Sequence, residues 1–134
     1  MTRYLAAADV MALNGEILAR MQGISSLLRD ENALESAVMR PRMAAHYEGA
    51  DLVAQATTLM AGIALAHAFV DGNKRTAFAA GRVFMSLNAL TFASDVLELA
   101  QQIEALVNRT GSLADAIERF ATWLRKRVIA RREA

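Results

Sequence analysis

The stretch His67-Ala-Phe-Val-Asp-Gly-Asn-Lys-Arg75 joins two apolar segments and decides how the fold is interpreted. From about residue 50 to His67, apolar side chains recur at helical spacing, and the pattern resumes near Asn73 and continues to about Asn88. Gly72 interrupts it, and glycine suits a turn because it adopts positive φ angles without steric cost. The sequence therefore predicts a helix, a short loop and a second helix, with the polar residues of the stretch on or beside the loop.

Two helices are predicted before this unit. Residues 6–21 have helical spacing of apolar side chains, and Gly23 is expected to end that helix. A second helix is expected to begin at Asn32, which can form a capping box with Glu35. It should be short, because the residue before a proline disfavours the helical conformation, and Pro41 therefore marks its end.

Two more helices are predicted after the unit. Ser94 is expected to cap the first of them, which runs through Leu106. Ser112, together with Asp115, is expected to cap the second, which runs through Leu124. Both are therefore predicted to start at a serine that satisfies free backbone N–H groups.

The segment 42–49 shows neither helical nor strand periodicity, so a short loop or β-hairpin is expected around residues 40–49. No internal repeat, low-complexity segment or long linker is visible, and residues 1–134 are interpreted as a single domain. The predicted fold class is all-α, a helical bundle with one irregular excursion around residues 40–49.

Composition excludes several kinds of protein. The 134 residues include 54% hydrophobic and 6% aromatic residues, which favours helices over sheets. The chain has no cysteine, which excludes disulfides and thiolate metal sites and fits a reducing compartment. The longest apolar run, residues 59–70, is too short to span a bilayer, and Asp9 and Glu16 interrupt any export signal. We therefore expect a soluble cytoplasmic protein without a membrane partner.

The carboxyl-terminal tail, residues 125–134, is basic although the net charge of the whole chain is only +1. Cations at a helix end complement the helix dipole, which is one interpretation of the tail. An acidic partner or nucleic acid is the other. The first is favoured, and direct nucleic-acid binding is not expected, because the near-neutral net charge argues against a dominant nucleic-acid footprint. The tail's charges are Arg125, Lys126, Arg127, Arg131 and Arg132, against Glu133.

The candidate catalytic residues are His67, Asp71, Lys74 and Arg75, of which the last two also belong to a candidate phosphate cradle. A hydroxyl attacks phosphorus well only if its proton is accepted, and histidine, with a pKa of about 6.5, is the usual acceptor at neutral pH. Asp71 offers hard oxygen ligands, which suit Mg²⁺ bridging nucleotide phosphates. Each residue alone has an ordinary explanation, since a lone histidine on an apolar helix is more often packed in a core and Asp-Gly is a common turn. Their occurrence together in nine residues favours a site.

The other polar residues of the stretch form a candidate phosphate cradle. Gly72 permits close approach of a phosphate to the backbone. Asn73, Lys74 and Arg75 fall at the start of the next helix, where free N–H groups and the helix dipole favour anions. Asn73 alone is also explained as a helix cap, and the two cations as a solvated first turn. Cations in that turn oppose the dipole, however, so their presence favours a bound anion.

At these residues the chain resembles the Fic/Doc superfamily, whose signature is His-x-Phe-x-Asp/Glu-Gly/Ala-Asn-Gly/Lys-Arg. HAFVDGNKR matches every specified position, and Lys74 is similar to the death-on-curing (Doc) branch, whereas many Fic enzymes have glycine there. The resemblance covers about residues 4–125. Flanking matches are Arg29-Asp30, Leu34-Glu35-Ser36-Ala37, Arg40-Pro41 and Thr76-Ala77.

The resemblance implies a Fic fold and a toxin that transfers the γ-phosphate of ATP, with Mg²⁺, to a hydroxyl of a translation factor similar to elongation factor Tu. By this resemblance, residues 42–47 are the candidate flap that aligns the target peptide. The implied roles are base for His67, Mg²⁺ ligand for Asp71, and phosphate cradle for the Gly72 backbone with Asn73, Lys74 and Arg75.

Self-restrained Fic proteins carry a Ser/Thr-x-x-x-Glu-Gly/Asn motif, which this chain lacks. Ser94 with Glu98 comes nearest, but Leu99 follows. The resemblance therefore implies a separate antitoxin as partner. Alternatives that stay open are a Fic-type AMP transferase, a catalytically silent helical binding module and, more weakly, a nucleic-acid-binding repressor that uses the tail.

Overall fold

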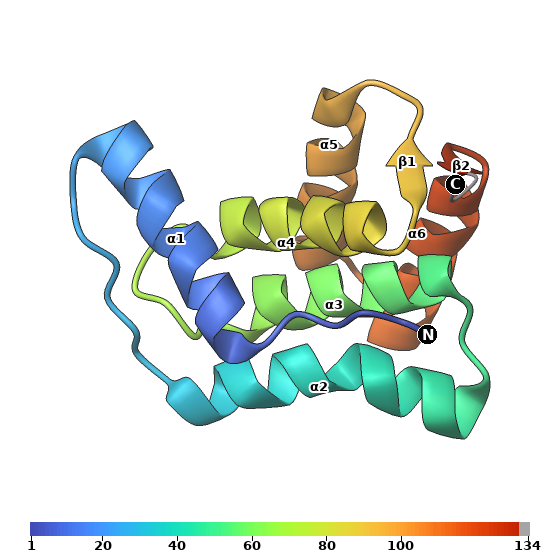
Figure 1. The fold of residues 1–134 in the computed structure, drawn as a ribbon, viewed down its shortest axis with the longest axis horizontal. Helices are drawn as coiled ribbons and strands as arrows, with labels where there is room; N and C mark the ends of the chain where they lie inside the picture. The colour runs from blue at the N-terminus through green and yellow to red at the C-terminus, as the bar shows by residue number, and fades with distance from the viewer. Residues whose placement is uncertain (132–134) are drawn as a thin grey trace.

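The computed structural model describes residues 1–131, and these form six helices and one two-stranded sheet (Figure 1). The predicted all-α class is confirmed. No helix in residues 1–131 combines the length and apolar character that crossing a membrane would require. The elements are α1 (Ala7–Gln22), α2 (Glu31–Glu48), α3 (Leu52–Ala66), α4 (Asn73–Leu87), β1 (Leu90–Phe92), α5 (Val96–Val107), α6 (Leu113–Arg125) and β2 (Val128–Ala130).

Helix α3 is the centre of the molecule and lies between α2 and α4 (Figure 1). It also contacts α5 and α6, so most of its residues are buried on every side rather than along one stripe. Gly62 permits close packing with α2, because a Cβ there would be 3.4 Å from the Cβ of Ala37. The predicted helix over residues 50–67 is confirmed, and its central position fixes where its carboxyl end, and the loop that follows, can lie.

Helix α2 corrects the prediction of a loop or β-hairpin around residues 40–49. The helix continues through Pro41 to Glu48, and Gly49, in the left-handed conformation, ends it. Proline removes one backbone hydrogen bond, but the buried face of α2 continues past it to Ala44, so packing on α3 outweighs that loss. The expected flap at residues 42–47 is therefore wrong as well.

Helix starts were predicted with mixed success. Asp30, not Asn32, caps α2, since its side chain accepts the Ala33 N–H at 3.0 Å. Asp95, not Ser94, caps α5, with its carboxylate 2.9 Å from the Leu97 N–H. Ser112 caps α6 as predicted, accepting the Asp115 N–H at 3.0 Å. Both errors lie one or two residues from the true cap, because neighbouring polar residues compete for that position.

The sheet was not predicted. β1 and β2 pair antiparallel, with Leu90 opposite Ala130 and Phe92 opposite Val128. The basic tail is therefore partly a strand, which pairs with β1. Arg132 and Glu133 lie outside the described residues.

Candidate active site

His67 terminates α3 in a left-handed conformation, with φ 51° and ψ 37°. Such a conformation is uncommon for a residue with a side chain. The side chain is exposed, as expected for a residue at the end of its helix. His67 is therefore available to solvent and to a second molecule.

The loop after His67 is fixed by Phe69 and Asn73. The Phe69 side chain is fully buried in the core, where it anchors the loop. The Asn73 side chain accepts the Phe69 N–H at 3.1 Å and donates to the Phe69 carbonyl at 2.9 Å. The Asn73 side chain therefore fixes the loop, and its backbone N–H lies at the predicted cradle.

The amino terminus of α4 has free backbone donors. Gly72 is its N-cap, with φ 79°, and no side chain within residues 1–131 caps the helix. The first helical backbone bond comes from the Thr76 N–H to the Gly72 carbonyl at 2.9 Å. The N–H groups of residues 73–75 precede it, and the first turn carries no acid, so the dipole and two exposed cations, Lys74 and Arg75, favour an anion there.

Asp71 lies at the edge of this helix end. Its carboxylate is exposed, and Oδ1 accepts the Gly72 N–H at 2.7 Å. Among residues 1–131, no group of three or more histidine, aspartate or glutamate side chains is placed to hold a metal ion. A lone carboxylate fits Mg²⁺ nonetheless, because Mg²⁺ is commonly held by one or two carboxylates together with substrate phosphates.

Glu104 of α5 contacts Lys74, and this contact was not predicted from the sequence. Its Oε2 lies 2.8 Å from Lys74 Nζ, and its Oε1 accepts a bond from Asn108 at 3.1 Å. The bond from Lys74, with that from Asn108, lowers the pKa of Glu104 below its ordinary value. The ion pair borders a pocket of about 450 Å³ between α4 and α5. It is lined by Lys74, Arg75, Phe78, Ala100, Ile103 and Glu104.

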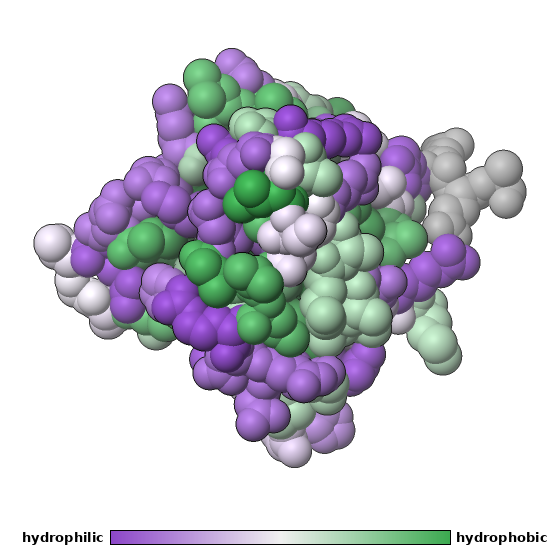
Figure 2. Space-filling view, turned by 90° about the vertical axis from the view of Figure 1, so that its left-hand side faces the viewer, coloured by the Kyte–Doolittle hydropathy of each residue, from purple (hydrophilic) through white to green (hydrophobic). Residues whose placement is uncertain are grey.

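The connection between α1 and α2, residues 23–30, runs antiparallel to the loop. Leu28 forms a β-bridge with Phe69, and the Val70 N–H donates to the Leu27 carbonyl at 3.0 Å. Ile24, Leu27 and Val70 are apolar but exposed. Figure 2 views the molecule from the side on which α1 and this connection lie in Figure 1, and it shows apolar side chains among hydrophilic ones.

Asn14 of α1 is a second residue that was missed, and it is completely buried. Its Nδ2 donates to the Asp71 carbonyl at 3.0 Å and to Thr76 Oγ1 at 3.1 Å. The sequence held one signal: Asn14 interrupts the buried face of α1 between Val10 and Leu18. A polar residue in such a position requires buried partners.

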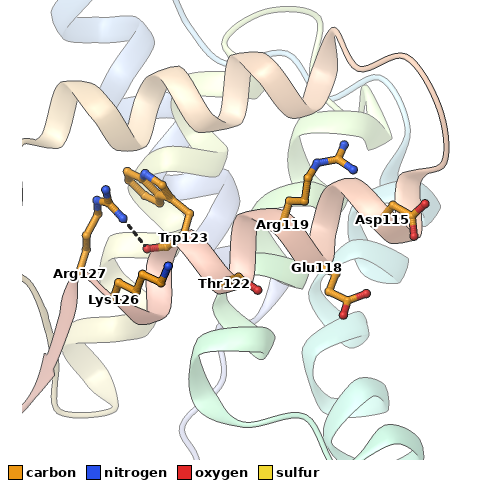
Figure 3. Close-up of a pocket in the computed structure, with 7 residues that line it drawn as sticks. All are labelled: Asp115, Glu118, Arg119, Thr122, Trp123, Lys126 and Arg127. Carbon is orange, nitrogen blue, oxygen red and sulfur yellow. Dashed lines mark hydrogen bonds between the residues drawn. The ribbon is translucent and has the colours of Figure 1, made fainter.

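The basic tail has partners within the chain. Arg125 contacts the Asp51 carboxylate at 3.0 and 3.1 Å, and Arg131 donates to the Ser86 carbonyl at 2.6 Å. Arg127 donates to the Trp123 carbonyl at 2.9 Å and stacks over its ring, beside a pocket of about 570 Å³ on α6 (Figure 3). These contacts favour the structural interpretation of the tail. That pocket shares no lining residue with the stretch 67–75. Its lining is Asp115, Glu118, Arg119, Thr122, Trp123, Lys126 and Arg127.

Comparison with known proteins agrees with the site. A model of the Fic/DOC family matches residues 4–85, which include the whole stretch 67–75. The chain belongs to this family. It is similar to the protein named Toxin Doc of Mycolicibacterium smegmatis (strain ATCC 700084 / mc(2)155), with 36% identity over 104 residues. The aligned part is 71% of this chain and 72% of that protein. Helix α5, with Glu104, follows the part that the family model matches.

Proposed function

We propose that the chain is the toxin of a toxin–antitoxin pair and transfers the γ-phosphate of ATP to a hydroxyl side chain of a translation factor. One observation carries the proposal. The uncapped amino terminus of α4, with Lys74 and Arg75, follows directly on a loop that exposes His67 and Asp71. An anion site beside a base and a hard carboxylate supports this proposal, because phosphoryl transfer uses all three groups.

In the proposed reaction the nucleotide phosphates bind at the amino terminus of α4. The backbone N–H groups of residues 73–75 and the cations of Lys74 and Arg75 hold them there. Asp71 would hold Mg²⁺, which would neutralise part of the phosphate charge. Lys74 supports γ-phosphate transfer over AMP transfer, because a long cation occupies space that a glycine would leave open and attracts the distal phosphates.

His67 is the general base. It accepts the proton of the target hydroxyl while the hydroxyl oxygen forms a bond to the γ-phosphorus. The bond from that phosphorus to the β-phosphate oxygen breaks, and ADP leaves. His67 is suited to this step because it is exposed at the end of α3.

The flap that aligns the target is residues 23–30 rather than residues 42–47. This segment bridges to the loop at Phe69, exposes Ile24 and Leu27, and contacts Val70 through Leu27. An extended target segment with apolar side chains fits beside it. We further propose a cytoplasmic location and an antitoxin that restrains the enzyme.

Two labelled nucleotides test the reaction. The protein is incubated in a translation extract with ATP labelled at either the α- or the γ-phosphate. Label should remain on a protein from the γ position only, and His67→Ala should lower its rate of incorporation by about 10²- to 10⁴-fold. Retention from the α position alone would mean AMP transfer.

A growth assay separates catalysis from binding. Expression of the wild type should arrest growth, and expression of a folded His67→Ala variant should not. Equal toxicity of the two would support a catalytically silent binding module. Relief of the arrest by a small protein encoded beside this gene would identify the antitoxin.

A further inference from the structure

Asn14 connects three segments that surround the candidate site. Its Nδ2 donates to the Asp71 carbonyl, 3.0 Å away in the loop, and to Thr76 Oγ1, 3.1 Å away in the second turn of α4. Its Oδ1 accepts a hydrogen bond from Ser26 Oγ, in the connection between α1 and α2. The amide thereby ties α1 to the loop, to α4 and to the connection that bridges to Phe69.

This position would ordinarily favour an apolar residue. Asn14 has 0% exposure and lies one turn from both Val10 and Leu18, which form the buried face of α1. Asparagine is a poor residue for a helix interior, and a buried amide is unfavourable unless it is hydrogen-bonded. Thr76 is also fully buried. The bonds of Asn14 therefore account for an amide where leucine would suit the helix better.

The hydrogen bonds of Asn14 restrain the backbone segment whose free N–H groups form the candidate anion site. Asp71 is the last residue before the N-cap, so its held carbonyl orients the peptide that joins it to Gly72. Gly72 itself lies against α1, because a Cβ there would be 3.2 Å from Asn14 Nδ2. Thr76 supplies the first helical N–H bond of α4, to the Gly72 carbonyl. Asn14 thus contacts the residues on both sides of the free N–H groups.

We propose that Asn14 is a positioning residue that holds the Asp71 carboxylate and the amino terminus of α4 in the geometry that binds magnesium nucleotide. It touches no substrate itself and acts through the Asp71 and Thr76 bonds. The ligand in this statement rests on the proposed function, whereas the effect on the loop does not. Residues that orient metal ligands from behind change metal affinity or activity by about 10- to 100-fold when replaced.

Two variants of Asn14 test the inference. Asn14→Asp keeps the shape and the acceptor for Ser26 but replaces the donor toward the Asp71 carbonyl with a repelling oxygen. Asn14→Leu removes all three bonds. The matched control is Gln55→Leu, which also replaces a buried amide. The Gln55 amide does not contact the loop; it bonds Tyr4 Oη at 2.7 Å and the Ala50 carbonyl at 3.0 Å.

Titration calorimetry with a non-hydrolysable ATP analogue and Mg²⁺ gives the first measurement. Both Asn14 variants should raise the Kd by about tenfold or more, and the Mg²⁺ dependence of binding should shift to higher concentration. Gln55→Leu should lower the Tm yet leave the Kd within about twofold of the wild type. If Gln55→Leu weakens binding as much as the Asn14 variants do, Asn14 matters only for stability and the inference is wrong.

Amide hydrogen exchange gives a second measurement that needs no nucleotide. Residues 71–76 should exchange faster in the Asn14 variants than in Gln55→Leu, compared at equal global stability. Should the wild type bind no nucleotide, the proposed function fails, and exchange alone then decides the inference. Unchanged exchange at residues 71–76 would overturn it.

Single-bond variants serve if the Asn14 variants do not fold. Thr76→Val keeps the shape of the side chain and removes the bond between Asn14 and α4. Ser26→Ala removes only the bond between Asn14 and the connection. Thr76→Val should weaken nucleotide binding and speed exchange at residues 71–76 more than Ser26→Ala does. The opposite order would contradict positioning through Asp71 and Thr76.

Discussion

At the scale of single residues, Gly72 combines two requirements that can be measured separately. Its φ of 79° strains any side chain, and a Cβ would also approach Asn14 Nδ2 and Leu18 Cδ2 at 3.2 Å each. Gly49 has φ 64° but nothing within 4 Å of its Cβ position. Gly49→Ala should therefore lower the free energy of unfolding by about 1–2 kcal/mol from strain alone, and Gly72→Ala should lower it further. Urea unfolding of both variants measures the difference.

If both glycine variants lose the same free energy of unfolding, the close approach of α1 to the loop does not constrain Gly72.

A second comparison of the two glycine variants measures their binding of the ATP analogue. Gly72→Ala should weaken its binding because the loop must shift, whereas Gly49→Ala, at the end of α2, should bind as the wild type does.

At the scale of elements, α5 places the Glu104 carboxylate on Lys74, where it competes with a phosphate for that cation. Glu104→Gln removes the competition, so the ATP analogue should bind about two- to fivefold more tightly at low salt, the range expected for an exposed pair. Glu98→Gln is the matched control, since it removes the same charge from α5 beside Arg127, 3.8 Å away, instead of beside Lys74. Calorimetry at low and high salt measures both.

The gain in affinity for the ATP analogue that Glu104→Gln produces should become smaller as the salt concentration rises, because salt screens exposed charges. Weaker binding by Glu104→Gln than by Glu98→Gln would mean that Glu104 holds Lys74 in a productive position rather than competing for it.

At the scale of the whole molecule, local patterns predicted the fold well and tertiary contacts account for what they missed. The helix–loop–helix of residues 50–88 was predictable because its apolar spacing and Gly72 are local signals. Pro41 was misleading, since its local penalty is outweighed by packing of α2 on α3. The strands were invisible, because three residues show no periodicity and their partners are distant in sequence. Glu104 and Asn14 were missed for the same reason: the contact of Glu104 with α4 and that of Asn14 with the loop exist only in the folded chain.

One tertiary contact of this kind makes the stability of the whole molecule depend on pH. Asp51, the N-cap of α3, accepts the Ala54 N–H and two bonds from Arg125 at the end of α6. The bond from Arg125 lowers the pKa of Asp51 in the folded state, and Asp51 raises the pKa of Arg125. A lowered folded pKa stabilises the protein at pH values above the unfolded pKa, about 3.9, and this contribution is lost as the pH falls through the folded pKa.

The variant Asp51→Asn keeps an acceptor for the cap but removes the charge and one of the two oxygens that accept from Arg125. Its free energy of unfolding at pH 7 should be lower than that of the wild type by about 0.5–1 kcal/mol, since the pair is half exposed. The difference should persist down to about pH 4 and then shrink, because wild-type Asp51 becomes protonated and resembles the variant. In an Arg125→Gln background the same substitution should lower the free energy of unfolding at pH 7 by a smaller amount. Urea unfolding at several pH values measures all four proteins. A difference that stays constant to the lowest pH at which the protein folds would show that the charge of Asp51 does not couple α3 to α6.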